Sequence, residues 1–246
     1  MIEQSWLQFD RVSKRFSGHS IVGEISLSLE KGEIFALCGG NGAGKSTFIK
    51  LITGVMKATS GDIYVEGSKV KAKSMEYREI FSYMPDNMLF PSQLTGYETL
   101  AFFARLRKVR EERVNEMLAL VGLDEVRNRL IKHYSKGMQQ RLSFAQALLP
   151  DSRFIILDEP TNGLDPFWFY RFKEILQMEK KKGKTILLTT HVLSLVEEIA
   201  DRVAFMENGK VIENDTVENL LKRDGKETSL EKAFFQKQMD ATRKPL

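Results

Sequence analysis

Residues 39–46 read Gly39-Gly40-Asn41-Gly42-Ala43-Gly44-Lys45-Ser46, and this stretch decides the fold. It matches the pattern G-x-x-x-x-G-K-[ST], in which glycines let backbone N–H groups turn inward around phosphate oxygens. The apolar run at residues 34–38 precedes the stretch, and apolar residues at helical spacing follow it at residues 46–53. A strand, a glycine-rich loop and a helix in this order predict a phosphate-binding loop at the start of an α/β unit.

The loop supplies the groups that a nucleotide needs for binding. The helix that begins near Lys45 directs the positive end of its dipole at the phosphates. Lys45 is expected to reach the β and γ phosphates, and Ser46 to bind Mg²⁺ through its hydroxyl. A glycine-rich turn arising by chance is the alternative, but such a match is on the order of a 1% event in a chain of this length. The predicted nucleotide contacts are Gly39, Gly40, Asn41, Gly42, Ala43, Gly44, Lys45, Ser46 and Thr47.

A second strand supplies carboxylates. Residues 154–157 form a continuous apolar run, typical of a buried parallel strand, and Asp158 and Glu159 follow directly. Asp158 is then placed to hold Mg²⁺ through water, and Glu159 to orient and deprotonate a water that attacks the γ-phosphate. An acidic strand end that merely faces solvent is the alternative. The phosphate-binding loop expected beside it favours the catalytic interpretation.

Composition sets wide limits on the function. The chain has 246 residues and a formal net charge of +4, which is too small to argue for nucleic acid as a partner. No apolar run approaches the ~20 residues of a membrane-spanning helix, and the first residues lack the pattern of a secretory signal. A single cysteine, Cys38, excludes internal disulfides. We therefore expect a protein of the cytoplasm without direct membrane insertion.

Hydrophobic periodicity divides the chain into regions. Period-2 alternation in the first thirty residues predicts an antiparallel sheet, and residues 63–70 predict a further hairpin. Helical spacing with a capping box at Thr95 and Glu98 predicts an all-helical insertion at about 92–150. The core then resumes, and Asn208-Gly209 marks a hairpin. We expect a cassette over residues 1–222 and a charged, helix-prone tail without a clear core over residues 223–246.

Several further motifs resemble those of one family. The segment at residues 134–141, Tyr-Ser-Lys-Gly-Met-Gln-Gln-Arg, is similar to a Leu-Ser-Gly-Gly-Gln signature followed by Gln-Arg, and Ser135 lies 23 positions before Asp158. Residues 158–166 resemble the acidic strand end and D-loop of the same family, and His191 resembles its switch histidine. The chain thus resembles the ATP-binding subunit of an ATP-binding cassette (ABC) transporter over about residues 6–222.

The resemblance implies a fold, a reaction and partners. The fold is an α/β P-loop NTPase core with a parallel sheet, an antiparallel β subdomain and an inserted helical subdomain. The cofactors are ATP and Mg²⁺, and Lys45, Glu159 and His191 are the catalytic residues. Two subunits, identical or different, close head to tail, so that Ser135 and Gly137 of one bind the ATP of the other, while Phe16 stacks on adenine. Transmembrane permease subunits are the other partners, which places the chain on the inner face of the cell membrane.

The sequence also departs from the family pattern. Lys136 stands in place of the first signature glycine and Met138 in place of the final glutamine. Lys136 either adds charge near the nucleotide or faces solvent, and we favour solvent. Asp86 stands in place of the Q-loop glutamine, where an ionised carboxylate accepts hydrogen bonds but cannot donate one. We assign Asp86 to the Mg²⁺ site. The apolar residues 88–91 that follow are expected to line the groove where a membrane subunit docks.

Two other classes of ABC-type ATPase are less consistent with the sequence. Chromosome-maintenance ATPases need a long coiled coil between the phosphate loop and the signature, but only 90 positions separate Lys45 from Ser135. The translation-factor type carries two cassettes, and this chain has one phosphate loop. A non-hydrolysing ATP sensor is disfavoured by Glu159 and His191. The signature variant resembles those of multidrug-type exporters and of the nitrous-oxide-reductase maturation system, so we expect an exporter whose cargo the sequence leaves open.

Overall fold

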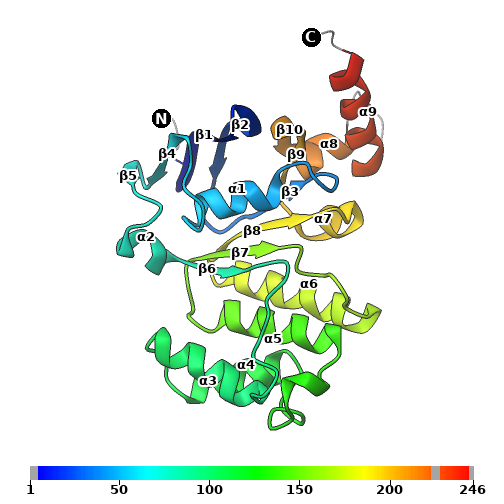
Figure 1. Ribbon diagram of the computed structural model, residues 1–246. Helices are drawn as coiled ribbons and strands as arrows, with labels where there is room; N and C mark the ends of the chain where they lie inside the picture. Colours follow the sequence, from blue (N-terminus) through cyan, green and yellow to red (C-terminus); the bar gives the residue numbers. More distant parts are fainter. Residues whose placement is uncertain (1–4, 223–227, 244–246) are drawn as a thin grey trace.

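The computed structural model describes residues 5–222 and 228–243 and arranges them in layers (Figure 1). A four-stranded antiparallel sheet forms the first layer, and helix α1 (Lys45–Ile52) lies between it and a six-stranded sheet. Helices cover the far face of the six-stranded sheet, and a further helical region extends beyond them. The expected α/β fold with a parallel sheet, an antiparallel sheet and inserted helices is confirmed.

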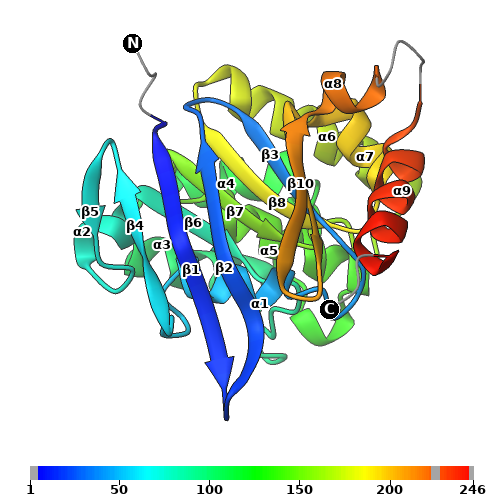
Figure 2. The same ribbon diagram turned by 90° about the horizontal axis from the view of Figure 1, so that it is seen from above.

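The antiparallel sheet has the strand order β2-β1-β4-β5 (Figure 2). Leu7 pairs with Leu29 and Phe9 with Leu27, and all four side chains are buried against the layer of α1. The alternation of apolar and polar residues therefore reports a sheet with one face in the core. The strands are β1 (Leu7–Phe16), β2 (His19–Leu29), β4 (Ser60–Val65) and β5 (Ser68–Val70).

The six-stranded sheet has the order β10-β9-β3-β8-β7-β6; the five strands from β9 to β6 are parallel to one another, and β10 pairs antiparallel with β9. Both faces of its centre are covered, so every residue of β3, β7 and β8 is buried. The carboxyl ends of these three strands meet at one edge of the sheet. The phosphate loop follows β3, Asp158 ends β7 and His191 follows β8. The strands are β3 (Ile34–Cys38), β6 (Phe81–Met84), β7 (Phe154–Asp158), β8 (Thr185–Thr190), β9 (Arg202–Glu207) and β10 (Lys210–Thr216).

The helical region lies between β6 and β7 in the chain. Its first helix begins with the expected capping box, in which Glu98 N donates to Thr95 Oγ1 and Thr95 N donates to Glu98 Oε2. Its last helix, α5 (Lys136–Leu148), carries Ser135 as N-cap and returns the chain to β7. The other helices of the molecule up to residue 221 are α2 (Met75–Ile80), α3 (Gly96–Leu106), α4 (Glu112–Leu120), a 3-10 helix (Ile131–His133), α6 (Pro166–Lys181), α7 (Leu193–Ile199) and α8 (Val217–Leu221).

The C-terminal tail has more contact with the core than its sequence indicates. Helix α9 (Leu230–Arg243) buries Leu230 and Ala233, and the ring of Phe234 lies 5.1 Å from that of Phe205 in β9. The expectation of a tail without a clear core is therefore wrong for this helix, while residues 223–227 and 244–246 lie outside the described part of the chain. None of the helices within the described residues is both long enough and apolar enough to cross a membrane.

Candidate functional site

The phosphate loop connects β3 to α1 in a shape that requires glycine. Gly42 has a φ of 81° and Gly44 a φ of 102°, in the left-handed region that side chains disfavour. A Cβ atom at Gly39 would lie 2.3 Å from the carbonyl oxygen of Met206, so no larger residue fits there. Gly40 and Gly42, in contrast, face open space. The loop is therefore tightly packed behind and open in front, as a phosphate cradle must be.

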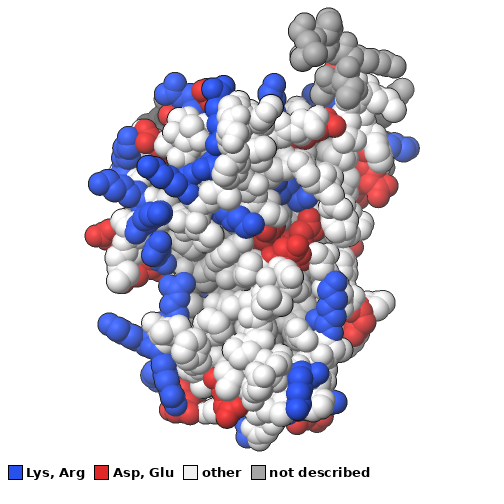
Figure 3. All heavy atoms as spheres, viewed as in Figure 1, with Lys and Arg blue, Asp and Glu red and all other residues white. Residues whose placement is uncertain are grey.

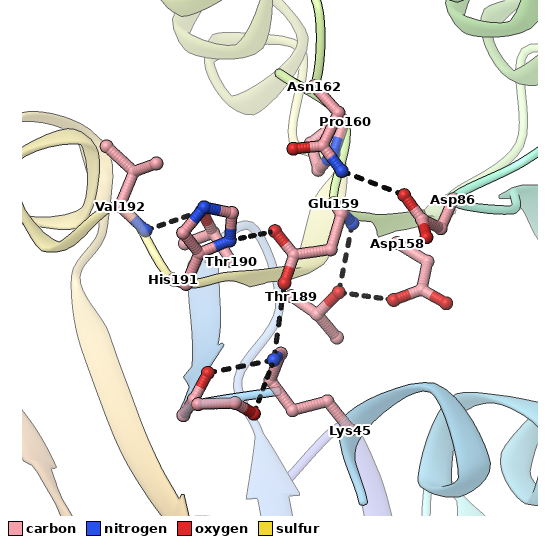
Figure 4. Close-up of polar contacts among 12 residues, drawn as sticks. Lys45, Asp86, Asp158, Glu159, Pro160, Asn162, Thr189, Thr190, His191 and Val192 are labelled. Carbon is pink, nitrogen blue, oxygen red and sulfur yellow. Dashed lines mark hydrogen bonds and ion pairs between the residues drawn. The ribbon is translucent and has the colours of Figure 1, made fainter. Parts of the chain in front are cut away.

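Lys45 is almost completely buried and fully paired (Figure 4). Its Nζ donates to the carbonyl oxygens of Gly39 at 2.8 Å and Gly40 at 3.3 Å, and it lies 3.2 Å from Glu159 Oε1. A buried ammonium group needs such partners, because an unpaired charge in the interior is costly. Phosphate oxygens in the loop would compete with the Glu159 carboxylate for this cation.

Glu159 is held from several sides. Its φ of 47° is in the left-handed region, which costs a non-glycine residue about 1–2 kcal/mol. Its backbone N–H donates to Thr189 Oγ1 at 3.0 Å, and its Oε2 lies 2.9 Å from Nδ1 of His191. The carboxylate thus lies between Lys45 and His191, at the end of β7. A strained, well-supported carboxylate at a cavity is typical of a functional residue.

The expected Mg²⁺ residues Ser46 and Asp158 face each other. Ser46 Oγ donates to Asp158 Oδ1 at 3.2 Å, and Thr189 Oγ1 donates to the same oxygen at 2.5 Å. Burial raises the pKa of Asp158, and the nearby carboxylates of Asp86 and Glu159 raise it further. Hydroxyl and carboxylate oxygens suit Mg²⁺, which also keeps water and phosphate ligands. The described residues contain no group of three or more His, Cys, Asp or Glu that could hold a metal ion.

Asp86 also reaches this site, from the loop after β6. Its Oδ1 accepts a hydrogen bond of 2.9 Å from Nδ2 of Asn162, in the loop between β7 and α6. A glutamine has both a donor and an acceptor, whereas Asp86 can only accept when ionised. The Asn162 amide supplies the matching donor. This contact therefore joins two loops that flank Asp158.

The phosphate loop, Asp86 and Glu159 line one cavity of about 340 Å³, within the size range of small-molecule sites. Ile21 of β2, which the sequence did not point to, contributes an apolar wall. Phe16 is not among the lining residues: it lies half-exposed at the end of β1, with Lys14 Nζ 4.6 Å from its ring centroid. The described lining residues are Ile21, Asn41, Gly42, Ala43, Gly44, Lys45, Ser46, Thr47, Asp86 and Glu159.

Ser135 and Gly137 lie in a different cavity, of about 280 Å³. Ser135 Oγ accepts from the backbone N–H of Met138 at 3.2 Å and so caps α5. Lys136 is exposed, as expected, with its aliphatic stem against Gly163. The structure therefore brings Lys45, Ser46, Asp158, Glu159, His191 and Asp86 together and leaves Ser135 and Gly137 apart from them.

Three contacts within the site were not foreseen from the sequence. Thr189 bridges Glu159 N–H and Asp158, and Asn162 binds Asp86. Gln140 of α5 donates from Nε2 to the carbonyl oxygens of Glu159 at 3.2 Å and Pro160 at 3.0 Å. Polar residues in buried surroundings were the available signal, because a buried amide must find partners.

Comparison with known proteins agrees with this geometry. A family model described as ABC transporter matches residues 22–162. The lantibiotic transport ATP-binding protein SrtF of Streptococcus pyogenes is 36% identical over 217 residues, covering 87% of this chain and 93% of that protein. The bacitracin transport ATP-binding protein BcrA of Enterococcus faecalis is 34% identical over 233 residues, covering 94% and 76%.

A solved structure described as the ATP-binding subunit of an ABC transporter has a TM-score of 0.86 and 30% identity. The match covers 95% of this chain and 100% of that one. The chain therefore belongs to the ABC transporter family as an ATP-binding subunit, and it is an ATPase.

Proposed function

We propose that this chain hydrolyses Mg²⁺-ATP in a head-to-tail dimer and thereby drives transport through separate membrane subunits. One observation carries the proposal: Lys45, Glu159 and His191 meet at the phosphate loop, while Ser135 lies in a separate cavity of the same chain. A second subunit, identical or different, is needed to bring a Ser135 to each phosphate loop. The proposed ATP site therefore requires the proposed dimer, and the two are tested together.

The residues divide the reaction between them. Bound Mg²⁺-ATP supplies the γ-phosphoryl group that is transferred to water. Backbone N–H groups of the loop and Lys45 bind the phosphates, with Ser46, Asp158 and Asp86 on the Mg²⁺ side. Once phosphate takes Lys45, the Glu159 carboxylate loses one ion-pair partner and is available to accept a proton from water. His191, 2.9 Å from Glu159, orients that carboxylate and is placed to contact the γ-phosphate.

Ser135 is proposed to bind the nucleotide of the opposite subunit. It begins α5, whose first backbone N–H groups and dipole attract an anion. The exposed ring of Phe16 is available to stack on the adenine base of its own site. Closing on ATP and reopening after hydrolysis would then provide the motion that is passed to the membrane subunits.

The docking surface for those subunits is proposed at the apolar residues after Asp86. Leu89 is 86% exposed, and Phe102 and Leu106 of α3 are exposed nearby in the helical region. Exposed apolar patches of this kind mark protein contacts. The chain would thus be held at the inner face of the cell membrane by partners rather than by insertion.

Nucleic acid is not the proposed partner. On the face in Figure 3, Lys and Arg side chains spread over the region of α1, α2 and β5, while Asp and Glu side chains gather near the middle. Protein surfaces that bind nucleic acid are dominated by positive charge, whereas this face carries charges of both signs. The relatives are described as transport proteins for a lantibiotic and for bacitracin, and we propose that this chain likewise serves an exporter. The membrane subunits select its cargo.

Glu159→Gln tests the proposed function. The amide keeps the size of the side chain and the loop that binds ATP but cannot accept the proton, so ATP binding should persist while hydrolysis falls by about 10²-fold or more. ATP should then accumulate in a stable dimer. Steady-state phosphate release and size-exclusion chromatography with Mg²⁺-ATP measure the two effects. The exposed Glu125→Gln serves as control and should hydrolyse ATP like the wild type.

Hydrolysis at the normal rate by Glu159→Gln would remove Glu159 as the base. A variant that binds ATP but stays monomeric under all conditions would refute the dimer. Parallel assays with and without DNA or RNA should give equal rates. Stimulation by nucleic acid would favour the rival class of ABC-type ATPases.

A further inference from the structure

Helix α5 is connected to two ATP sites of the proposed dimer, one through its N-cap and one through a side chain within the helix. Its N-cap Ser135 lines the cavity that we assign to the nucleotide of the opposite subunit. Five positions later, Gln140 contacts the loop that carries this chain's own Glu159. Gln140 lies in this 13-residue helix and Ser135 caps its first turn, so we expect the two residues to move together. The inference below rests on the proposed dimer.

The Gln140 contact is buried and uses both hydrogens of the side-chain amide. Nε2 donates to the carbonyl oxygens of Glu159 at 3.2 Å and Pro160 at 3.0 Å, and Gln140 is 8% exposed. Glu159 has left β7 with a φ of 47°, so these two carbonyls fall outside the ladder of the sheet. A buried carbonyl without a donor is costly, and Gln140 satisfies two of them at once.

The first turn of α5 also packs tightly on the end of the same loop. A Cβ atom at Gly137 would lie 2.8 Å from the carbonyl oxygen of Gly163. Asn162, between these two contacts, is tied to Asp86. The loop from Glu159 to Gly163 therefore touches α5 near both of its ends. A shift of α5 cannot leave the backbone of Glu159 in place without breaking hydrogen bonds.

We propose that Gln140 is a positioning residue that couples the two ATP sites of the dimer. It fixes the backbone of Glu159 in the left-handed conformation that directs the carboxylate at the phosphate loop. When Ser135 binds the nucleotide of the opposite subunit, the position of α5 is fixed. Gln140 then holds the backbone of Glu159 in its own site through its two hydrogen bonds. Each site thus reaches its full rate only when the other is occupied and closed.

Gln140→Leu tests this proposal, because leucine has a similar volume but no donor. The kcat of ATP hydrolysis should fall about tenfold or more, since small misplacements of a catalytic group have costs of this size. The KM for ATP should stay within about twofold, because Lys45 and the phosphate loop are untouched. Gln140→Asn, one methylene shorter, keeps an amide but cannot reach both carbonyls, and it should show the same split. Gln139→Leu is the control: the side-chain amide of Gln139 donates to Tyr134 O, at 3.3 Å, rather than to the loop after β7, and the variant should retain normal kcat and KM.

A second measurement separates positioning from a general loss of structure. In a Glu159→Gln background, Gln140→Leu should still form the ATP-dependent dimer, because the cap of α5 by Ser135 is intact. Loss of the dimer, or a rise in KM equal to the fall in kcat, would overturn the proposal, as would unchanged kcat. If the wild type itself neither hydrolyses ATP nor dimerises as Glu159→Gln, the proposed function fails instead, and the two failures are distinguishable.

Discussion

Glu159 concentrates the chemistry of the site in a single residue. Its carboxylate contacts Lys45 and His191, and its backbone is held by Thr189 on one side and Gln140 on the other. Side chains from three separate segments, the start of α1, the end of β8 and helix α5, thus determine where one carboxylate points. Such support is what keeps a strained residue in place. The role of Glu159 therefore depends on positioning as much as on its own basicity.

Glu33 is a second carboxylate whose surroundings have consequences, here for stability. It lies 7% exposed just before β3, where Oε1 accepts from the backbone N–H of Glu30 at 2.8 Å and lies 3.7 Å from Arg202. Burial is the largest influence on it and raises its pKa from 4.5 to about 7. The folded protein therefore holds a proton on Glu33 at pH values where the unfolded chain has lost it.

Stability should consequently fall as this group loses its proton. The contribution of Glu33 is fully favourable below pH 4.5 and is lost as the pH rises through 7. Glu33→Gln is always neutral and keeps the acceptor for Glu30 N–H. The free energy of unfolding of this variant, relative to that of the wild type, should therefore increase as the pH rises from 4.5 through 7. Urea unfolding at several pH values measures the difference. A constant difference from pH 4 to 8 would contradict the raised pKa.

At the scale of elements, α9 extends the core beyond the cassette expected from the sequence. The ring of Phe234 packs on Phe205, and Leu230 N–H donates to Glu197 Oε1 of α7. Lys237 of α9 also pairs with Glu213 of β10 at 2.6 Å. The helix is thus attached by apolar, polar and charged contacts together, and it should contribute to stability.

A neighbouring pair of residues tests that attachment. Phe234 is partly buried on the core, whereas Phe235 is 58% exposed. Phe234→Ala should lower the free energy of unfolding by about 2–3 kcal/mol, below the full cost of a completely buried ring, and Phe235→Ala by less than about 0.5 kcal/mol. Chemical denaturation measures both. Equal small effects would show that α9 does not stabilise the core.

Elements with local signals were predictable and those with distant contacts were not. The strand at residues 34–38, the capping box at Thr95 and the Asn208-Gly209 hairpin follow from periodicity and turn chemistry, and the structure contains all three. Helix α9 shows helical spacing, but its partner Phe205 lies 29 positions earlier. No local pattern reports a contact of that range.

The candidate site divides in the same way. The phosphate loop, Asp158, Glu159 and His191 carry motifs, and the fold brings them together. The sequence indicates Gln140 only as part of the Gln-Arg that follows the signature and predicts no contact for it. Its role becomes visible when Glu159 leaves the sheet in a left-handed conformation, which sequence does not encode as a pattern. Ile21 joins the cavity only through the pairing of distant strands.

At the scale of the molecule, one chain presents two unlike half-sites. The cavity at the phosphate loop and the cavity at Ser135 are formed by different residues, and no described residue lines both. In the proposed head-to-tail dimer, a two-fold axis would bring each half-site onto its counterpart and close the assembly at two subunits. ATP would then lie within the interface, and dimer formation and hydrolysis would be parts of one cycle.

Mixing two inactive variants tests this central claim most directly. Lys45→Ala removes the phosphate contact and Ser135→Arg blocks the opposite half-site, so each variant alone should hydrolyse almost no ATP. In a mixed dimer, one site combines an intact Lys45 with an intact Ser135. An equal mixture should therefore hydrolyse ATP measurably faster than either variant alone, but at no more than about a quarter of the wild-type rate per chain if exchange is random, because the second site of the mixed dimer is disabled on both sides. A mixture that stays as inactive as its two components would contradict the head-to-tail site.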